Sequence, residues 1–225
     1  MPCLGDLPSG ELNRVPLVAP LSRNMSFAAV PSVEPFKRIR HFAKGEVVFR
    51  QGEQARGVFL IRRGSVKLYM TSGKGRAVIL RIARAGEMLG LAATLSAEPY
   101  LASAETLEAT ELAYAEREQF LSCLAQDPDV SLSVARQACA NYQNACRQVS
   151  LLGLCRSAGE RVAHFILNWP SPVLDLTHEE IAQAAGTTRE TVTRTLAGFR
   201  KNGWASLAAS KLTIQSREAL EKLVA

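Results

Sequence analysis

Two short helices joined by a tight turn are predicted between Thr177 and Leu196, and this pattern constrains the fold more than any other part of the chain. Thr177, with Glu180 three residues later, forms a capping box that begins a helix. Gly186 is suited to end that helix, and one of the two threonines after it caps the next. Apolar side chains recur at helical spacing, at Ile181, Ala184 and Ala185 in the first helix and at Val192, Leu196 and Phe199 in the second.

This spacing leaves four polar side chains facing outward near the start of the second helix: Arg189, Glu190, Thr193 and Arg194. In a helix-turn-helix protein, that end of the second helix enters the major groove of DNA. An arginine there can bind guanine through O6 and N7, and a glutamate can accept a hydrogen bond from cytosine N4. An ordinary solvated helix face is the alternative, but the turn and both caps favour a DNA-reading helix.

The size and charge of the chain are compatible with a nucleic-acid partner. It has 225 residues, of which 47% are hydrophobic, and a formal net charge of +6. The charge is uneven, because residues 37–84 contain 13 Lys and Arg against 2 acids, whereas residues 154–225 contain 9 against 7. We therefore expect DNA affinity to depend on dimerisation and flanking contacts. The basic block is either a second electrostatic surface or a solvated charged sheet.

Targeting signals are not recognisable in this sequence. No apolar run reaches the length of a membrane span. The N-terminus lacks the basic start and apolar core of a signal peptide. We expect a cytoplasmic protein without a membrane partner, in which the five cysteines are mainly reduced thiols.

The chain before residue 126 is predicted to form an arm and a β domain. Residues 1–30 contain four prolines and show no clear period, so we expect an N-terminal arm. Residues 31–125 contain short apolar runs between glycines, which is typical of an all-β sandwich or barrel. The runs are Val47–Phe49, Val58–Ile61, Val66–Met70 and Val78–Leu80, with Ser72–Gly75 as a hairpin connection.

A long helix over residues 126–153 is predicted to follow, after a short helix at Glu116–Leu124. Its apolar seam is narrow, with spacings of three and four, whereas a globular two-face helix has a wider stripe. A narrow seam predicts a parallel dimer through a two-stranded coiled coil. The alternative is packing against the chain's own β domain. The predicted seam is Val134, Ala138, Tyr142, Ala145, Val149 and Leu152.

Residues 154–225 are predicted to form a winged helix-turn-helix domain. A small β wing places Lys211 where it can meet a phosphate, and Ser216 caps a final helix. The expected elements are a helix at Arg161–Trp169, wing strands at Ala205–Leu207 and Leu212–Ile214, and a final helix whose Leu220 and Leu223 pack inward.

With this order of parts, the chain resembles the CRP/FNR superfamily of bacterial transcription regulators over nearly all of residues 36–215. The motifs that carry the resemblance are Gly45–Gly52 (GEVVFRQG), Val58–Leu68 (VFLIRRGSVKL), Gly86–Gly90 (GEMLG) and the helix-turn-helix at Thr177–Arg194. The resemblance implies an α+β fold: an N-terminal antiparallel β jelly-roll barrel that holds an effector, a long dimerisation helix and a C-terminal winged helix-turn-helix. It also implies a homodimer that binds double-stranded DNA and RNA polymerase, and that is not an enzyme.

The resemblance also assigns roles to individual residues of the DNA-binding domain. In the family an arginine, a glutamate and a second arginine read a half-site like TGTGA, and these positions match Arg189, Glu190 and Arg194. Thr193 stands where other members carry glycine or serine. The positions that match phosphate contacts are Thr177, Thr188, Thr191 and Lys211.

The barrel departs from the cyclic-nucleotide-binding members of the family. Those members resemble one another in a Gly-Glu pair, whose Glu holds the ribose hydroxyl, and a later Arg-Ser pair, whose Arg holds the cyclic phosphate. Here Leu91 follows Gly90, and no arginine occurs between Arg84 and Arg117. A buried cyclic phosphate would be poorly compensated. We therefore expect cyclic AMP not to be the effector. The candidate effector pocket is Gly90, Leu91, Leu101, Ala102, Ser103, Ala145 and Cys146.

Other cofactors of the family are also disfavoured. An iron–sulfur member needs an N-terminal cysteine cluster, whereas this chain has Cys3 alone there. Haem is disfavoured because His41, His164 and His178 are scattered. No metal, cofactor or catalytic residue is therefore predicted.

Two further functions stay open beside an effector-controlled regulator. One is a constitutive regulator whose barrel is filled by its own side chains. The other is a redox-responsive regulator acting through Cys139 and Cys146, seven residues apart on one helix face, although free cysteines are also common apolar filler in packed interfaces. A barrel enzyme is disfavoured, because His41 alone offers no metal-ligand set.

Overall fold

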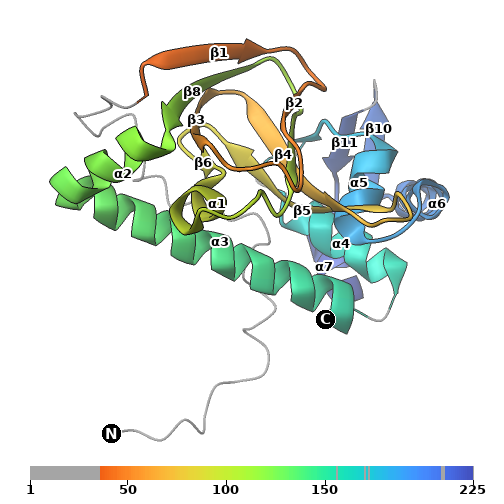
Figure 1. Cartoon of the computed structure of the whole chain (residues 1–225). Helices are drawn as coiled ribbons and strands as arrows, with labels where there is room; N and C mark the ends of the chain where they lie inside the picture. The colour runs from red at the N-terminus through yellow and green to blue at the C-terminus, as the bar shows by residue number, and fades with distance from the viewer. Residues whose placement is uncertain (1–35, 156, 170, 172, 209–210, 225) are drawn as a thin grey trace, which may run out of the picture. The chain divides into compact units, whose positions relative to one another are not determined.

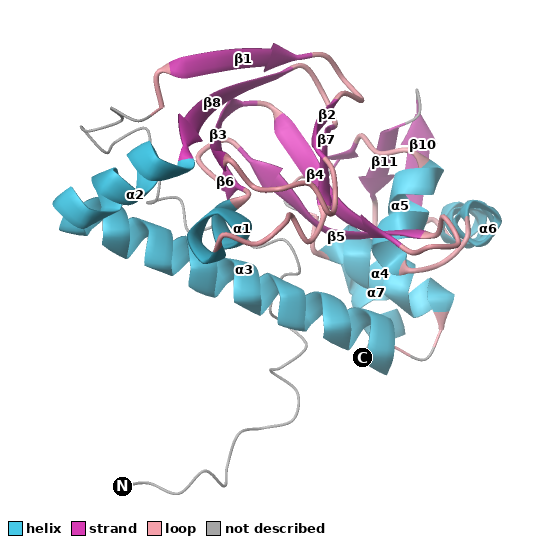
Figure 2. Cartoon of the chain, in the orientation of Figure 1, coloured by secondary structure: helices cyan, strands magenta, loops and turns pink. Residues whose placement is uncertain are grey.

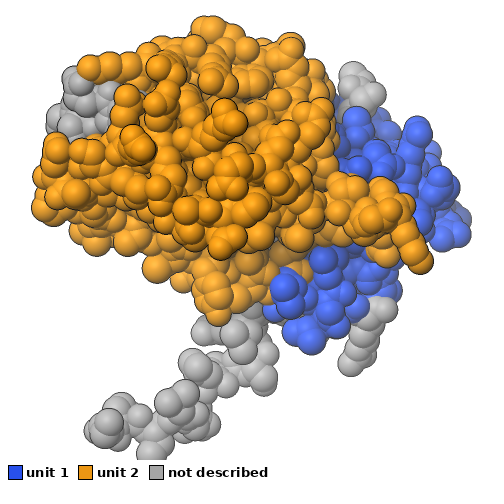
Figure 3. All heavy atoms as spheres, in the orientation of Figure 1, with its two compact units in different colours: residues 1–20, 149–225 blue, residues 21–148 orange. Residues whose placement is uncertain are grey.

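The computed structural model describes residues 36–155, 157–169, 171, 173–208 and 211–224. They form two compact units, one up to Gln148 and one from Val149 onward (Figure 3). The predicted arm at residues 1–30 lies outside the described residues. None of the helices in the described part of the chain is both long and apolar enough to cross a membrane.

The first unit contains two four-stranded sheets, each antiparallel throughout (Figures 1 and 2). One has the order β1-β8-β3-β6 and consists of β1 (Arg38–Phe42), β8 (Thr110–Glu116), β3 (Gly57–Arg63) and β6 (Met88–Leu89). The other has the order β2-β7-β4-β5 and consists of β2 (Val47–Phe49), β7 (Ser103–Thr106), β4 (Ser65–Thr71) and β5 (Ala77–Arg84). The predicted antiparallel β domain is confirmed.

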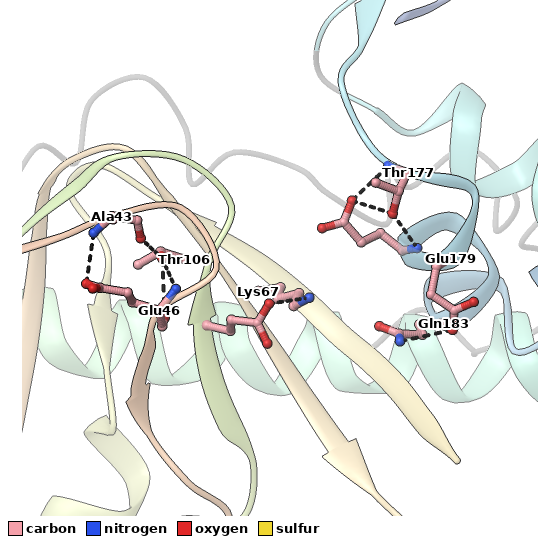
Figure 4. A network of polar contacts seen from close by, with 9 residues as sticks. Ala43, Glu46, Lys67, Thr106, Thr177, Glu179 and Gln183 are labelled. Atoms are coloured by element: carbon pink, nitrogen blue, oxygen red, sulfur yellow. Dashed lines mark hydrogen bonds and ion pairs between the residues drawn. The ribbon is translucent and has the colours of Figure 1, made fainter. Parts of the chain in front are cut away.

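The four apolar runs predicted as strands lie in β2, β3, β4 and β5. The β4–β5 hairpin closes where predicted, since the Gly75 N–H donates to the Ser72 carbonyl over 2.8 Å. The sequence analysis missed β1, whose residues are mostly exposed and polar and contain no apolar run. Between strands, the Thr106 hydroxyl donates to the Ala43 carbonyl and accepts from the Glu46 N–H (Figure 4).

Aromatic rings fill much of one apolar core of this unit. The ring of Tyr100 stacks on Phe49 with their centroids 3.9 Å apart. Its phenol donates to the Gly57 carbonyl over 3.1 Å, and burial raises the pKa of Tyr100 to about 12, so the phenol stays a donor. A Cβ added at Gly90 would lie 2.8 Å from this ring, and Gly90 has φ 77°, so glycine is required there.

Three helices begin in this unit: α1 (Leu91–Ser96), α2 (Arg117–Gln126) and α3 (Pro128–Leu154). The last is one uninterrupted helix that continues past the unit boundary (Figure 1). The Asp127 carboxylate accepts from the Val130 N–H over 3.1 Å and so caps α3. The predicted short and long helices are confirmed to within two residues at each end.

One face of α3 packs on a second apolar core within the same unit. Val130 and Val134 are buried there together with Leu91. The Gln137 amide accepts from the Met88 N–H over 3.1 Å and donates to the Met88 carbonyl over 2.8 Å. Val134 was predicted to lie in the dimer seam, and this is wrong. The pattern misled because hydrogen-bonded glutamines share the buried face and left no apolar stripe to recognise.

Gln148 makes a similar contact further along α3. This side chain is buried and donates from its amide nitrogen to the Ile79 carbonyl over 2.9 Å. Two glutamines on one helix face therefore bind the backbone of β6 and of β5.

The second unit combines helices with a small sheet. Its helices are α4 (Ala158–Leu167), α5 (His178–Ala185), α6 (Arg189–Lys201) and α7 (Arg217–Val224), and its strands are β9 (Val173–Leu174), β10 (Ala205–Ala208) and β11 (Lys211–Ile214). The predicted wing is confirmed as β10 and β11, and β9 adds a third strand in the order β10-β11-β9. Leu220 is fully buried as predicted, but Leu223, near the end of α7, is 36% exposed.

Candidate nucleic-acid interface

The turn between α5 and α6 has the geometry that its sequence predicts. The Thr177 hydroxyl accepts from the Glu180 N–H over 3.2 Å, and the Glu180 carboxylate accepts from the Thr177 N–H over 2.8 Å (Figure 4). Gly186 ends α5 with φ 58° in the left-handed region. The Thr188 hydroxyl then accepts from the Thr191 N–H over 3.3 Å and caps α6. The capping box and both caps are confirmed.

The inward face of this motif holds α6 against the rest of its unit. Val192, Leu196 and Phe199 are buried, as are Ile181, Ala184 and Ala185 of α5. Arg161 of α4 donates from Nε to the Ala185 carbonyl over 2.8 Å and so satisfies an end of α5. The polar residues of α6 are thereby left on its opposite face.

The predicted base-reading residues gather on that opposite face. Arg189, Glu190, Thr193 and Arg194 are all exposed in the first turns of α6. The pKa of Glu190 lies below its ordinary value, because its carboxylate accepts hydrogen bonds from its own N–H and from Thr188 and lies near Arg189. At neutral pH this face therefore presents guanidinium donors beside one ionised acceptor, as base-edge recognition requires.

His178 is a residue of this face that the sequence analysis did not select. Its Nδ1 lies 2.8 Å from the hydroxyl oxygen of Thr193, which also donates to the Arg189 carbonyl over 3.0 Å. The contact joins the first residue of α5 to the reading helix. The sequence has no local sign of this contact, because His178 and Thr193 are fifteen residues apart and meet only when the helix-turn-helix folds.

The four predicted phosphate-contact residues surround this face at different places. Thr177, Thr188 and Lys211 are exposed and Thr191 is half-buried. The Thr188 and Thr191 hydroxyls lie 3.1 Å apart. Lys211 begins β11 in the wing, with its Nζ 3.7 Å from an Asp175 carboxylate oxygen. That exposed pair is weak enough for a phosphate to compete with it.

The residues predicted to line an effector pocket do not share one surface. Leu91 is buried in the apolar core beneath α3, whereas Leu101 is 72% exposed. Gly90 borders the Tyr100 ring, and Ala102 and Ser103 are buried, with Ser103 accepting from the Gln51 N–H over 2.9 Å. Ala145 and Cys146 are exposed on the outward face of α3.

Two largely buried cationic side chains of the β unit, Lys67 and Arg81, have carboxylate partners. Lys67 Nζ lies 2.8 Å from Glu105, with the lysine side chain 10% exposed. Arg81 forms an ion pair with Glu87, and both side chains are largely buried. A charged ligand in this part of the barrel would have to compete with these pairs.

The remaining predicted seam residues lie away from the unit's core. Ala138, Tyr142, Ala145, Val149 and Leu152 are all exposed on α3. Among the cysteines that the structure describes, Cys139 and Cys146 are exposed free thiols and Cys123 and Cys155 are half-buried ones. Within the described ranges, no three His, Cys, Asp or Glu side chains are grouped to hold a metal ion.

Comparison with protein families gives two matches. Residues 39–127 match the model described as a cyclic nucleotide-binding domain, and residues 160–223 match a Crp-like helix-turn-helix domain. The first range covers the β unit up to the end of α2, just before α3 begins, and the second runs from within α4 to α7.

Individual proteins are similar along most of the chain. The "Cyclic AMP receptor protein" of Thermus thermophilus is 27% identical over 209 residues, which cover 91% of this chain and 96% of that protein. The "Global nitrogen regulator" of Synechocystis is 28% identical over 222 residues, covering 92% and 95%. Among solved structures, FixK2 from Bradyrhizobium japonicum has a TM-score of 0.74 at 24% identity, over 84% of this chain and 97% of that one, which shows the shared fold.

Proposed function

The chain belongs to the CRP/FNR family of DNA-binding transcription regulators, and from that premise we propose that it acts as a homodimer on a palindromic site with TGTGA-like half-sites. The observation that carries the proposal is the exposed set of Arg189, Glu190 and Arg194 at the start of α6. Two arginines and one ionised glutamate match the donor and acceptor pattern of G·C pairs in such a half-site.

The dimer is supported by the outward face of α3. Tyr142 and Val149 are each more than 70% exposed there, and a monomer would leave these side chains in water. A two-fold dimer places two reading helices about one helical turn of DNA apart. RNA polymerase is the further partner we propose, and the bacterial cytoplasm is where such a complex would form.

The proposal includes a barrel that does not respond to cyclic AMP. Leu91 is a core residue rather than a ribose ligand, and Lys67 and Arg81 are paired with carboxylates. Relatives of nearly equal identity bear names that refer to cyclic AMP and to nitrogen, so similarity alone does not select a signal. The alternative is constitutive binding, which the stacked rings of Phe49 and Tyr100 in the barrel core favour.

Fluorescence anisotropy with a labelled TGTGA-N6-TCACA duplex tests the proposal at one fixed salt concentration. We expect tight binding that is unchanged by cyclic AMP. Arg189→Ala should reduce discrimination at one guanine by about 1–3 kcal/mol. Lys222→Ala removes the same charge from exposed α7 and should leave discrimination unchanged. Binding that appears only with cyclic AMP would overturn the effector proposal, and equal selectivity of Arg189→Ala would overturn the assignment of the reading residues.

A further inference from the structure

The exposed face of α3 carries a regular apolar pattern. Leu132 is 50% exposed, Tyr142 72% and Val149 71%, and the cysteines and alanine that complete the pattern are exposed as well. We call this set the outward seam: Leu132, Ala135, Cys139, Tyr142, Cys146 and Val149. Its spacings alternate between three and four, which is the a/d pattern of a coiled coil.

The face of α3 that packs on the chain's own core mixes apolar and polar side chains, since Val130 and Val134 are buried there as well. The face packed on the chain's own core includes Gln137 and Gln148, both buried and hydrogen-bonded to backbone. The outward seam instead consists of apolar residues and two thiols. An exposed helix face with apolar residues at this regular spacing indicates a covering partner.

A second copy of the chain fits the outward seam. Its heptad spacing matches another helix of the same period, and a two-fold axis supplies that helix without any other protein. None of the six seam residues is charged, and between Val130 and Leu154 the helix contains two arginines and no acid. Self-association is therefore not opposed by charge within the seam, and no acidic residue favours a basic partner.

The cysteines occupy equivalent positions in this pattern. Leu132, Cys139 and Cys146 follow one another at intervals of seven, so all three take position a, while Tyr142 and Val149 take position d. In a parallel two-fold pair, a residue at position a lies beside its own counterpart across the axis. Each exposed thiol would therefore lie beside an identical thiol.

We propose that Cys139 forms a reversible disulfide with Cys139 of a second copy, covalently closing the dimer through α3. The inference rests on the dimer proposed above. The oxidant is a peroxide: the two thiols lose two hydrogens, one S–S bond forms, and hydrogen peroxide is reduced to two waters. A low-molecular-weight thiol reverses the reaction by exchange, which cleaves the S–S bond.

The size of the neighbouring side chains determines which of the two exposed cysteines forms the disulfide faster. A disulfide requires the two Cα atoms to lie within about 7 Å, so the two helices have to pack closely at the cysteine. Cys139 follows Ala135 and Ala138, both exposed and small, so the helices can come together there. Cys146 lies between Tyr142 and Val149 in the outward seam, two larger side chains that would hold the helices further apart. Cys146 is therefore the slower of the two.

Alternative pairings are disfavoured by geometry. Cys139 and Cys146 are seven residues apart on one helix, or about 10.5 Å along its axis, which no disulfide spans. Cys123 packs against the chain's own apolar core, and burial raises its pKa. Burial also raises the pKa of Cys155. Both thiols therefore form less thiolate at a given pH and react more slowly.

Peroxide treatment of the full chain, followed by thiol blocking and non-reducing electrophoresis, tests the proposal. We expect wild type to migrate as a covalent dimer that a reductant returns to the monomer position. Cys139→Ser should slow crosslinking by about tenfold or more, because the preferred pair is gone. Cys146→Ser, Cys123→Ser, Cys155→Ser and Cys3→Ser should each crosslink like wild type. The cysteines are substituted one at a time because Cys139 and Cys146 fall in one tryptic peptide, between Arg136 and Arg147. Peptide mapping would therefore not distinguish their disulfides.

Two outcomes separate failure of this inference from failure of the proposed dimer. Sedimentation of the reduced protein gives its oligomeric state: a monomer would overturn both the dimer and the disulfide. A reduced dimer that peroxide does not crosslink, or that crosslinks as fast with Cys139→Ser, would overturn the disulfide alone. Once the disulfide has formed, the dimer no longer dissociates on dilution. Oxidised wild type should therefore still bind the duplex at protein concentrations so low that the reduced dimer dissociates, whereas Cys139→Ser should not.

Discussion

The reading helix α6 and the barrel differ in whether the residues predicted to have a function are also part of the core. In α6 the four predicted base-reading side chains are all exposed, and the side chains that hold the helix are all on the other face. In the barrel the predicted pocket includes Leu91, which is a core residue, and Leu101, which is 72% exposed. In the helix-turn-helix, a predicted functional residue can therefore be replaced without loss of stability. In the barrel, replacing Leu91 would change the core as well.

The physical reason is that sequence periodicity predicts side-chain directions only within a regular helix or strand. A helix repeats every 3.6 residues, so the burial of three apolar residues fixes the direction of every neighbour. The segment after β6 turns at Gly90, forms six residues of helix and returns in a loop, so local spacing does not fix which side chains face inward. A ligand pocket there depends on contacts far apart in the chain.

Among the substitutions that test this difference between the reading helix and the barrel, the largest effect is expected at Leu91. Leu91→Ala should destabilise the β unit by about 2–5 kcal/mol, because it empties space in a packed core. Leu101→Ala removes the same atoms from an exposed position and should change stability by less than about 0.5 kcal/mol. Urea unfolding followed by far-UV circular dichroism measures both. Similar small effects of the two substitutions would show that Leu91 faces a cavity after all.

The next largest effect is expected at the turn of the helix-turn-helix. Gly186→Ala should destabilise the second unit by about 1–2 kcal/mol, because a side chain is disfavoured at its positive φ. A Cβ there would also lie 2.4 Å from the Leu152 side chain. Gly198→Ala is the matched control: it lies within α6 with open space around a Cβ, and should stabilise by about 0.5–1 kcal/mol.

Tryptophan fluorescence during urea unfolding measures this pair, because both tryptophans of the chain, Trp169 and Trp204, lie in the second unit. Equal signs for Gly186→Ala and Gly198→Ala would contradict the role given to the left-handed turn.

A smaller effect would sharpen the separation of function from stability. His178→Ala removes the contact to Thr193 and should weaken DNA binding by about 0.5–1.5 kcal/mol, the usual net value of one hydrogen bond. Unfolding followed by tryptophan fluorescence should change little, since both side chains lie on the outer face. Gln183→Ala, on the same helix, provides a control for the loss of an exposed polar side chain. A stability loss as large as the binding loss would show that His178 supports the fold instead.

The smallest effect concerns pH. Burial lowers the pKa of His164 below its ordinary value of 6.5, and its Nδ1 lies 3.0 Å from the Asn168 amide nitrogen, which can only donate. The unfolded chain therefore binds more protons, so this stabilisation is present above pH 6.5 and is lost as pH falls towards the lowered pKa. Urea unfolding at pH 7.5 and 5.5 should show the loss, and His164→Gln should reduce it. His41→Gln, on exposed β1, should retain it.

Much of the second unit followed from sequence, whereas α3 shows where sequence reasoning stopped. The caps at Thr177 and Thr188, the turn at Gly186 and the wing are local features, and each was confirmed. In α3 the length was predicted but the seam was rotated, so that Val134 was assigned to the wrong face. A glutamine is counted as polar in any sequence pattern, yet Gln137 is fully buried because the Met88 backbone supplies both partners.

Those glutamines have a consequence for the solubility of the β unit. β6 and β5 are the outermost strands of their sheets, where backbone N–H and C=O groups lack a neighbouring strand on one side. Gln137 accepts and donates to Met88 as an adjacent strand would, and Gln148 meets the Ile79 carbonyl. A chain that ended before α3 would expose both sheet edges to pairing with other molecules. The part of α3 within this unit therefore covers edge positions at which other molecules could otherwise pair.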